Sequence, residues 1–176
     1  MNNPVLLENL RCIPDFPKKG INFRDVTTLY KNPECMKIMV DEMYELYKDK
    51  GITKIVGIES RGFVMAAALA TKLGAGVVLA RKPGKLPATV IKESFSKEYG
   101  VDTVEMHIDS IDKNDVVLIH DDLLATGGTA KATLKLVNHF HPKKVYMNFI
   151  IEITDEGLHG RDCLEKDVEV TTLMVI

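Results

Sequence analysis

Two adjacent acidic residues, Asp121 and Asp122, precede a short run of small residues that leads into a helical pattern. The run consists of Ala125, Thr126, Gly127, Gly128 and Thr129. At a helix start the backbone N–H groups are unpaired, the helix dipole favours an anion, and glycine allows close approach. Carboxylates accept hydrogen bonds from a diol but repel a second phosphate. The pattern therefore predicts a site for a ligand that carries a phosphate and neighbouring sugar hydroxyls.

Two common phosphate-binding patterns do not fit this run. Its spacing differs from that of the Gly-x-x-x-x-Gly-Lys-Ser/Thr loop, and it lacks the three glycines of the dinucleotide fingerprint. An acidic strand end followed by an ordinary Gly-Gly turn is the simpler alternative. The acid pair, the small residues and a strand–loop–helix context together favour the ligand site.

Cationic residues follow two other expected strands. Ser60 and Arg61, in the segment Glu-Ser-Arg-Gly, place an arginine and free backbone donors at a helix start, which predicts a second anion site. A further cluster lies on a proline-containing loop and comprises Arg81, Lys82 and Lys85. Taken alone, this cluster is a solvated surface turn, and its interpretation as a site depends on a ligand with more than one anionic group.

The elements that must position these residues alternate between strands and helices. Branched aliphatic residues at 116–119 predict a strand buried on both faces, with the acid pair at its carboxyl end. Further strands are expected at 55–58, 77–80, 145–151 and 168–174, and helices at 33–47, 63–73, 128–140 and 156–164. This alternation predicts a parallel sheet, and the loops that follow its strands should lie together along one edge.

The first of these helices has a clear start and a clear buried face. Asn32 is placed to cap it, with Pro33 at its first position. Its buried stripe is expected to consist of Met36, Met39, Val40, Met43 and Tyr47. A methionine stripe at helical spacing indicates core packing.

Two segments fall outside the alternation of strands and helices. Residues 1–30 contain prolines and glycine that forbid a long helix, so they predict a small irregular lobe. Residues 88–108 are polar and irregular, and they predict a long loop or a hairpin of the kind that acts as a lid. We expect a single domain over residues 1–176.

Composition excludes several classes of protein. The chain has 23 basic and 25 acidic residues and a net charge of −2, which predicts neither a nucleic-acid surface nor a membrane surface. No apolar run approaches 18 residues and no secretion signal is visible, so we expect a soluble cytoplasmic protein. Its three cysteines, Cys12, Cys35 and Cys163, are far apart and predict reduced thiols, not a disulfide framework or a zinc site.

The stretch 116–130 resembles the ribose-phosphate motif of the type I phosphoribosyltransferases. Other motifs occur with it and in order, and the set resembles the adenine phosphoribosyltransferases along nearly the whole chain, with a weak match over the last 20 or so residues. The motifs are Asp-Phe-Pro at 15–17, Gly-Ile-Asn-Phe-Arg-Asp at 20–25, Ser-Arg-Gly-Phe at 60–63, Arg-Lys-Pro-Gly-Lys-Leu-Pro at 81–87 and Glu-Tyr-Gly at 98–100. One departure is His120, where the family usually has an aliphatic residue; we expect a buried, hydrogen-bonded histidine with no catalytic role.

The resemblance implies an α/β fold: a twisted, mostly parallel sheet flanked by helices, with a small N-terminal hood and a long flexible loop. It also implies transfer of the 5-phosphoribosyl group from 5-phosphoribosyl 1-pyrophosphate to adenine, giving AMP and pyrophosphate. Mg²⁺ would bind through the substrate, with at most a water-mediated contact to Asp121 or Asp122 and no direct protein ligand. A homodimer is the implied assembly. Two alternatives stay open: a 6-oxopurine phosphoribosyltransferase and a regulator that senses a ribose phosphate.

The resemblance assigns a role to each candidate residue. Asp121 and Asp122 would face the ribose hydroxyls, and residues 125–129 would wrap the 5-phosphate. Glu98 would be the catalytic acid of the long loop. Pyrophosphate would be bound by Ser60, Arg61, Arg81, Lys82 and Lys85. Adenine would be stacked by Phe23 and recognised by the backbone of Asn22 and Arg24. The resemblance further implies a cis peptide bond between Glu59 and Ser60.

Overall fold

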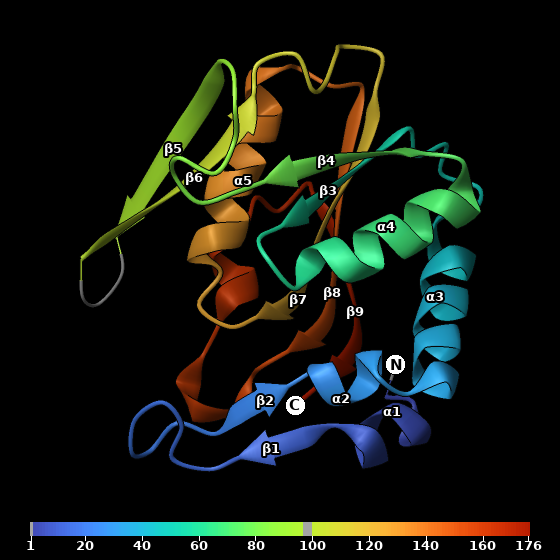
Figure 1. Cartoon of the computed structure of the whole chain (residues 1–176), viewed down its shortest axis with the longest axis vertical. Coiled ribbons are helices and arrows are strands. Elements are labelled where there is room, and N and C mark those ends of the chain that lie inside the picture. Colours follow the sequence, from blue (N-terminus) through green and yellow to red (C-terminus); the bar gives the residue numbers. More distant parts are fainter. Residues whose placement is uncertain (1, 97–99) are drawn as a thin grey trace.

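A five-stranded parallel sheet forms the centre of the computed structural model, which describes residues 2–96 and 100–176 (Figure 1). Its strands lie in the order β4-β3-β7-β8-β9, and every neighbouring pair is parallel. The strands are β3 (Lys54–Ile58), β4 (Gly76–Ala80), β7 (Val116–Leu124), β8 (Lys144–Glu152) and β9 (Glu169–Val175). The parallel sheet that the sequence predicts is confirmed. Its central strands are apolar on both sides because helices cover both faces of the sheet.

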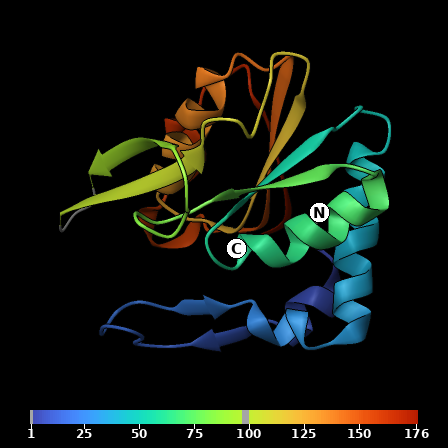
Figure 2. The same cartoon turned by 45° about the horizontal axis from the view of Figure 1, so that its top comes forward.

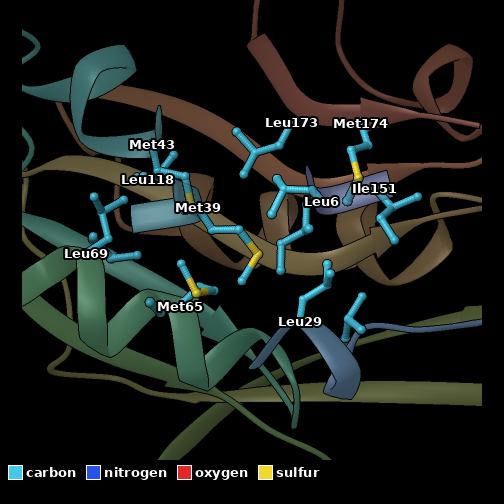
Figure 3. Close-up of a cluster of buried hydrophobic side chains, with 14 of the residues drawn as sticks. Leu6, Leu29, Met39, Met43, Met65, Leu69, Leu118, Ile151, Leu173 and Met174 are labelled. Carbon is cyan, nitrogen blue, oxygen red and sulfur yellow. The ribbon is translucent and has the colours of Figure 1, made fainter. Parts of the chain in front are cut away.

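Helices α3 (Pro33–Tyr47) and α4 (Gly62–Leu73) cover one face, and α5 (Gly128–His139) covers the other. Figure 3 shows side chains of α3 and α4, among them Met39 and Met65, gathered against Leu118 and Ile151 of the sheet. The predicted start of α3 is confirmed, since the Asn32 side chain accepts hydrogen bonds from two backbone N–H groups of the first turn. Of the predicted stripe, Met39, Met43 and Tyr47 are fully buried, while Met36 and Val40 are partly buried.

The N-terminal segment is more regular than the sequence predicts. It contains α1 (Pro4–Asn9), an antiparallel pair formed by β1 (Arg11–Ile13) and β2 (Phe23–Asp25), and the short helix α2 (Thr27–Tyr30). The prediction of an irregular lobe was wrong because Pro4 lies at the start of α1, while Pro14 and Pro17 lie in the connection between the strands and leave the strands free to pair. This segment lies beyond the carboxyl ends of β7, β8 and β9 (Figures 1 and 2).

Residues 90–96 and 101–107 form the second small sheet. Its strands β5 (Val90–Ser96) and β6 (Val101–His107) pair antiparallel, so the hairpin is the form that this segment takes. The hairpin packs against α5, and Val104 and Met106 are buried in the same cluster as the inner side of that helix.

The helix predicted at 156–164 was wrong. Two 3₁₀ segments stand in its place, η1 (Asp155–Gly157) and η2 (Gly160–Cys163). Gly157 adopts a φ of 72°, a left-handed conformation that ends a helical turn. Among the helices in the described part of the chain, none is long and apolar enough to cross a membrane.

Candidate active site

The sequence predicts the acid pair at the carboxyl end of the strand. In the structure both acids lie inside β7, which continues to Leu124. Pairing with β8 continues past the acids to the register Leu124–Glu152, so the hydrogen-bonded ladder extends the strand beyond the apolar run. Successive side chains of a strand point to opposite faces, and Asp121 and Asp122 therefore face different sides of the sheet. Asp122 is almost fully buried, while Asp121 lines the cleft described below.

The run of small residues connects β7 to α5 as predicted. Helix α5 begins at Gly128, and Gly127 adopts a φ of 78°, which a residue with a side chain rarely tolerates. The unpaired N–H groups of the first turn of α5 therefore lie directly after the acid pair in the chain. This geometry suits an anion.

Two adjoining hollows at the carboxyl ends of β3, β4 and β7 form one cleft. They share the lining residues Glu59, Lys82 and Asp121, and their volumes are about 180 and 290 Å³. The predicted site residues that line the cleft are Ser60, Arg61, Arg81, Lys82, Asp121, Asp122 and Thr129. Thus the structure brings both cationic clusters and the acid pair together, as the topology of the sheet requires.

Arg61 links the acid pair to the N-terminal segment. Its Nε donates to the carboxylate of Asp122, and its guanidinium lies over the Phe23 ring, 5.6 Å from the ring centroid. Burial is the largest single effect and lowers the pKa of Arg61, but the charge and hydrogen bond of Asp122, together with the charges of Asp121 and Tyr30, raise that pKa above its ordinary value. The side chain is therefore a fixed positive charge at the cleft.

Arg81 is held by Glu59, a residue to which the sequence assigned no role. The Arg81 guanidinium donates to both Glu59 carboxylate oxygens, at 3.2 and 3.1 Å, and the Lys82 N–H donates to the same carboxylate at 2.8 Å. Burial works against this carboxylate, yet the two donors lower the pKa of Glu59. The sequence held a signal for this contact, because Glu59 directly follows β3 and Arg81 directly follows the neighbouring strand β4.

The ionised form of Asp121 is disfavoured in its surroundings, although the Asp122 N–H and the charge of Arg61 offset part of this effect. Burial and the adjacent Asp122 carboxylate raise the pKa of Asp121 well above its ordinary value. A group that brings positive charge, or that donates hydrogen bonds, would stabilise the ionised carboxylate. The cleft is therefore prepared for a ligand of that kind.

Tyr30 is another residue that the sequence analysis missed. Its hydroxyl donates to the Arg61 carbonyl at 3.1 Å, and burial raises its pKa above the usual value, with Asp122 and Asp121 adding to the effect. Tyr30 thus fastens α2 to the loop after β3. No spacing rule connects two residues 31 positions apart, so the sequence holds no signal for this contact.

The remaining predicted residues lie around the cleft or outside the described chain. Phe23 and Arg24 belong to β2, where Arg24 pairs with Asp155 at 2.9 Å, and Asn22 directly precedes that strand. Lys85 does not line the cleft; its carbonyl accepts from Arg81 at 3.0 Å. Glu98 lies outside the described residues.

Two smaller predictions are confirmed. The peptide bond between Glu59 and Ser60 is cis. His120 is fully buried, with its Nδ1 3.0 Å from Asn148 Oδ1, and burial lowers its pKa to about 4. It is therefore neutral at physiological pH.

Comparison with known proteins agrees with the geometry. The family described as "Phosphoribosyl transferase domain" matches residues 25–167. An adenine phosphoribosyltransferase of Phocaeicola vulgatus is 60% identical over 176 residues, which cover 100% of both chains. One of Actinobacillus pleuropneumoniae serotype 5b is 50% identical over 163 residues, or 93% of this chain and 90% of that protein.

Solved structures show the same likeness. The crystal structure of the adenine phosphoribosyltransferase from Rhodothermus marinus superposes with a TM-score of 0.91 at 46% identity, covering 98% of this chain and 97% of that one. The Giardia lamblia enzyme, crystallised with 9-deazaadenine, gives a TM-score of 0.92 at 38% identity, covering 100% and 98%. The chain therefore belongs to the adenine phosphoribosyltransferases, within the phosphoribosyl transferase domain family.

Proposed function

We propose that the chain transfers the 5-phosphoribosyl group from 5-phosphoribosyl 1-pyrophosphate to adenine, giving AMP and pyrophosphate. The observation that carries this proposal is the single cleft lined by Asp121, Asp122, Thr129 and the two cationic clusters. A sugar diol, a phosphate and a pyrophosphate are the groups that these three sets of side chains and N–H groups would bind. Production of AMP gives the chain a place in purine salvage.

The acid pair and the loop 125–129 hold the ribose 5-phosphate end of the substrate. Asp121 and Asp122 accept hydrogen bonds from the ribose hydroxyls, and such donors favour the ionised form of Asp121, which burial and Asp122 disfavour. The N–H groups at the start of α5 bind the 5-phosphate, which the helix dipole also attracts. The sugar is thereby fixed at both ends.

The cationic side chains act on the leaving group. Breaking the bond between C1 of the ribose and the pyrophosphate oxygen builds positive charge on the ribose and negative charge on pyrophosphate. Arg61, Arg81 and Lys82 stabilise that negative charge, and Lys85 contributes from the same loop. Because Asp122 and Glu59 already hold the two arginines in place, the guanidinium groups are positioned before the substrate arrives.

Mg²⁺ fits the donor set of this cleft when it is bound through the substrate. In the part of the chain that is described, no group of three or more His, Cys, Asp or Glu side chains could hold a metal ion. Asp121 and Asp122 line the cleft, and a hydrated ion bound through the substrate would contact one of these carboxylates through water. Bound there, Mg²⁺ would neutralise charge on the leaving pyrophosphate.

The N-terminal segment recognises the base. Phe23 stacks on the purine, beside Phe16, whose ring meets it edge-on at 5.3 Å between centroids. Backbone groups of Asn22 and Arg24 recognise the 6-position, where adenine presents an amino donor next to the N1 acceptor. A 6-oxopurine reverses this pattern and leaves buried groups unpaired, at a cost of about 1–3 kcal/mol each.

Three further assignments complete the proposal. Glu98 acts as the catalytic acid and helps to exclude water from the reactive ribosyl centre. The active assembly is a homodimer, supported by the exposed apolar side chains of Val77 and Leu79 on the edge strand β4 and of Val64 on α4. The free thiols of the three cysteines support action in the cytoplasm.

The activity is tested by supplying the purified chain with 5-phosphoribosyl 1-pyrophosphate, adenine and Mg²⁺. Pyrophosphate and AMP should appear in equal amounts and only when all three are present. Omission of adenine, or chelation of Mg²⁺, should abolish both products. Pyrophosphate release that does not depend on adenine would refute the proposal.

A further inference from the structure

The 3₁₀ segment η2 lies unusually close to the loop 125–129. A Cβ atom built on Gly160 would be 2.3 Å from the Ala125 carbonyl oxygen, and one built on Gly127 would be 2.4 Å from the Gly160 carbonyl oxygen. Atoms that are not bonded do not approach so closely. The backbone at Ala125 therefore fits only because residue 160 is glycine, and the backbone at Gly160 fits only because residue 127 is glycine. The two segments therefore share one fixed geometry.

An ion pair holds η2 in that position. Arg161, next to Gly160, donates through Nε to Glu152 Oε1 at 2.8 Å and through its second nitrogen to Glu152 Oε2. Its remaining nitrogen donates to the Val170 carbonyl at 2.8 Å. The guanidinium thus contacts both β8 and β9 and ties η2 to the edge of the sheet.

The ion pair is also tied to the strand that leads into the loop. Glu152 is the last residue of β8 and lies opposite Leu124, the last residue of β7. The next residue, Ile153, donates its N–H to the Leu124 carbonyl at 2.9 Å. The pairing at Glu152 therefore holds the end of β7, where the loop 125–129 begins. Gly160 holds the loop backbone at Ala125 and Gly127.

Burial makes this ion pair costly to break. Glu152 is only 7% exposed, and its hydrogen bonds to Arg161 lower its pKa. If Arg161 were removed, an unpaired carboxylate would be left in a buried place, and β8, β9 or η2 would have to move to let in water. The same movement would release Gly160 from the loop.

We propose that Glu152, Arg161 and Gly160 form a brace that sets the backbone geometry of the loop 125–129 for the 5-phosphate. This inference rests on the proposed function of that loop. None of the three residues lines the cleft, so they are positioning residues that act through Ala125 and Gly127. The N–H groups of the loop bind phosphate only while the brace keeps them pointing to one place.

Two variants and two matched controls test the brace. Arg161→Lys keeps the charge but loses the two-pronged contact with Glu152, and Gly160→Ala adds the Cβ that would meet Ala125. Lys50→Gln removes an ion pair with Glu169 at the opposite end of the sheet. Gly76→Ala adds a Cβ that meets only the flexible end of the Lys54 side chain and the more distant Thr53 carbonyl.

Two measurements distinguish the brace from a general effect on folding. Calorimetric titration with ribose 5-phosphate reports the phosphate loop and the acid pair without the pyrophosphate and base sites, and steady-state kinetics give KM for each substrate. Both brace variants should bind ribose 5-phosphate roughly 10- to 100-fold more weakly and raise KM for the ribosyl pyrophosphate, with the adenine KM within about twofold of wild type. Both controls should match wild type.

Each other outcome contradicts a stated claim. If wild type binds ribose 5-phosphate and Arg161→Lys binds it equally well, the brace is refuted while the proposed function stands. If Arg161→Lys weakens both substrates alike, its role is general stability and the brace is again refuted. If wild type itself does not bind ribose 5-phosphate, the proposed function of the loop fails and the brace fails with it. Should Gly160→Ala not fold, Arg161→Lys decides.

Discussion

At the scale of single residues, the charges of the cleft are arranged in pairs before any ligand binds. Asp122 holds Arg61, and Glu59 holds Arg81 together with the Lys82 N–H. Preorganised charges need little rearrangement when pyrophosphate departs, so they stabilise the transition state more than flexible side chains would. The sequence analysis predicts the cations but assigns no carboxylate to either arginine.

Phe23 provides the first test at this scale. Loss of its ring in Phe23→Ala removes stacking worth about 1–3 kcal/mol, which should raise the adenine KM roughly 10- to 100-fold. The KM of the ribosyl pyrophosphate should stay near its wild-type value, because the cleft of β3, β4 and β7 is unchanged. Steady-state kinetics with each substrate varied in turn make the measurement.

Asn22→Ala is the matched control for Phe23→Ala. Because the backbone and not the side chain of Asn22 is assigned to the base, this variant should keep its preference for adenine. Acceptance of hypoxanthine by Asn22→Ala would show that the side chain recognises the base.

Glu98 provides the second test. A positioned acid or base contributes about 10²- to 10⁴-fold to a rate, so Glu98→Gln should lower kcat by that factor. Affinity for ribose 5-phosphate should change little, because the 5-phosphate is assigned to the loop 125–129 and not to Glu98. Single-turnover kinetics measure the chemical step directly, and near-normal turnover would remove Glu98 from the mechanism.

At the scale of elements, the sequence predicts best where one local signal decides the outcome. The strands 55–58 and 77–80 and the cap at Asn32 were located because an apolar run or a capping side chain specifies each of them. Two elements were misjudged for different reasons. A partner distant in the sequence decides the first, since pairing with β8 carries β7 past its acids. The helix predicted at 156–164 is interrupted by the left-handed conformation of Gly157.

The hairpin of β1 and β2 depends on a buried carboxylate, and its stability should depend on pH. Asp25 accepts hydrogen bonds from the Thr27 hydroxyl at 2.7 Å and the Thr27 N–H at 3.0 Å, and from Arg11, and these lower its pKa to about 2. Because folding lowers this pKa, the stabilisation is complete above the ordinary value of 3.8 and is lost as the pH falls from 3.8 toward 2.

The variant Asp25→Asn tests that dependence. At pH 7 it should lower the free energy of unfolding by about 1–3 kcal/mol, the usual loss for hydrogen bonds to a charged group. The difference from wild type should shrink as the pH falls toward 2, and urea denaturation at several pH values measures it. Asp167→Asn, at an exposed position, should have no such effect. A constant difference across this pH range would contradict the role of Asp25.

At the scale of the whole molecule, one edge of the sheet gathers residues from distant parts of the chain. Ser60 and Arg81 lie just beyond the carboxyl ends of β3 and β4, Asp121 lies in the carboxyl half of β7, and the strand order β4-β3-β7 makes them neighbours. The sequence predicts this meeting because the topology of parallel sheets requires it. It does not predict Tyr30 or the contact of η2 with the loop, since both depend on how separate layers pack.

The most direct test of the whole account is the choice of base. Pyrophosphate release from 5-phosphoribosyl 1-pyrophosphate should be measured with adenine, hypoxanthine, guanine and xanthine under the same conditions, and the nucleotide product identified. We predict AMP as the product and a kcat/KM for adenine at least ~10²-fold above that for each 6-oxopurine, because the reversed hydrogen-bond pattern leaves buried groups unpaired. Equal or faster turnover of hypoxanthine or guanine would contradict the account, and no turnover with any base would point to a ligand-sensing protein.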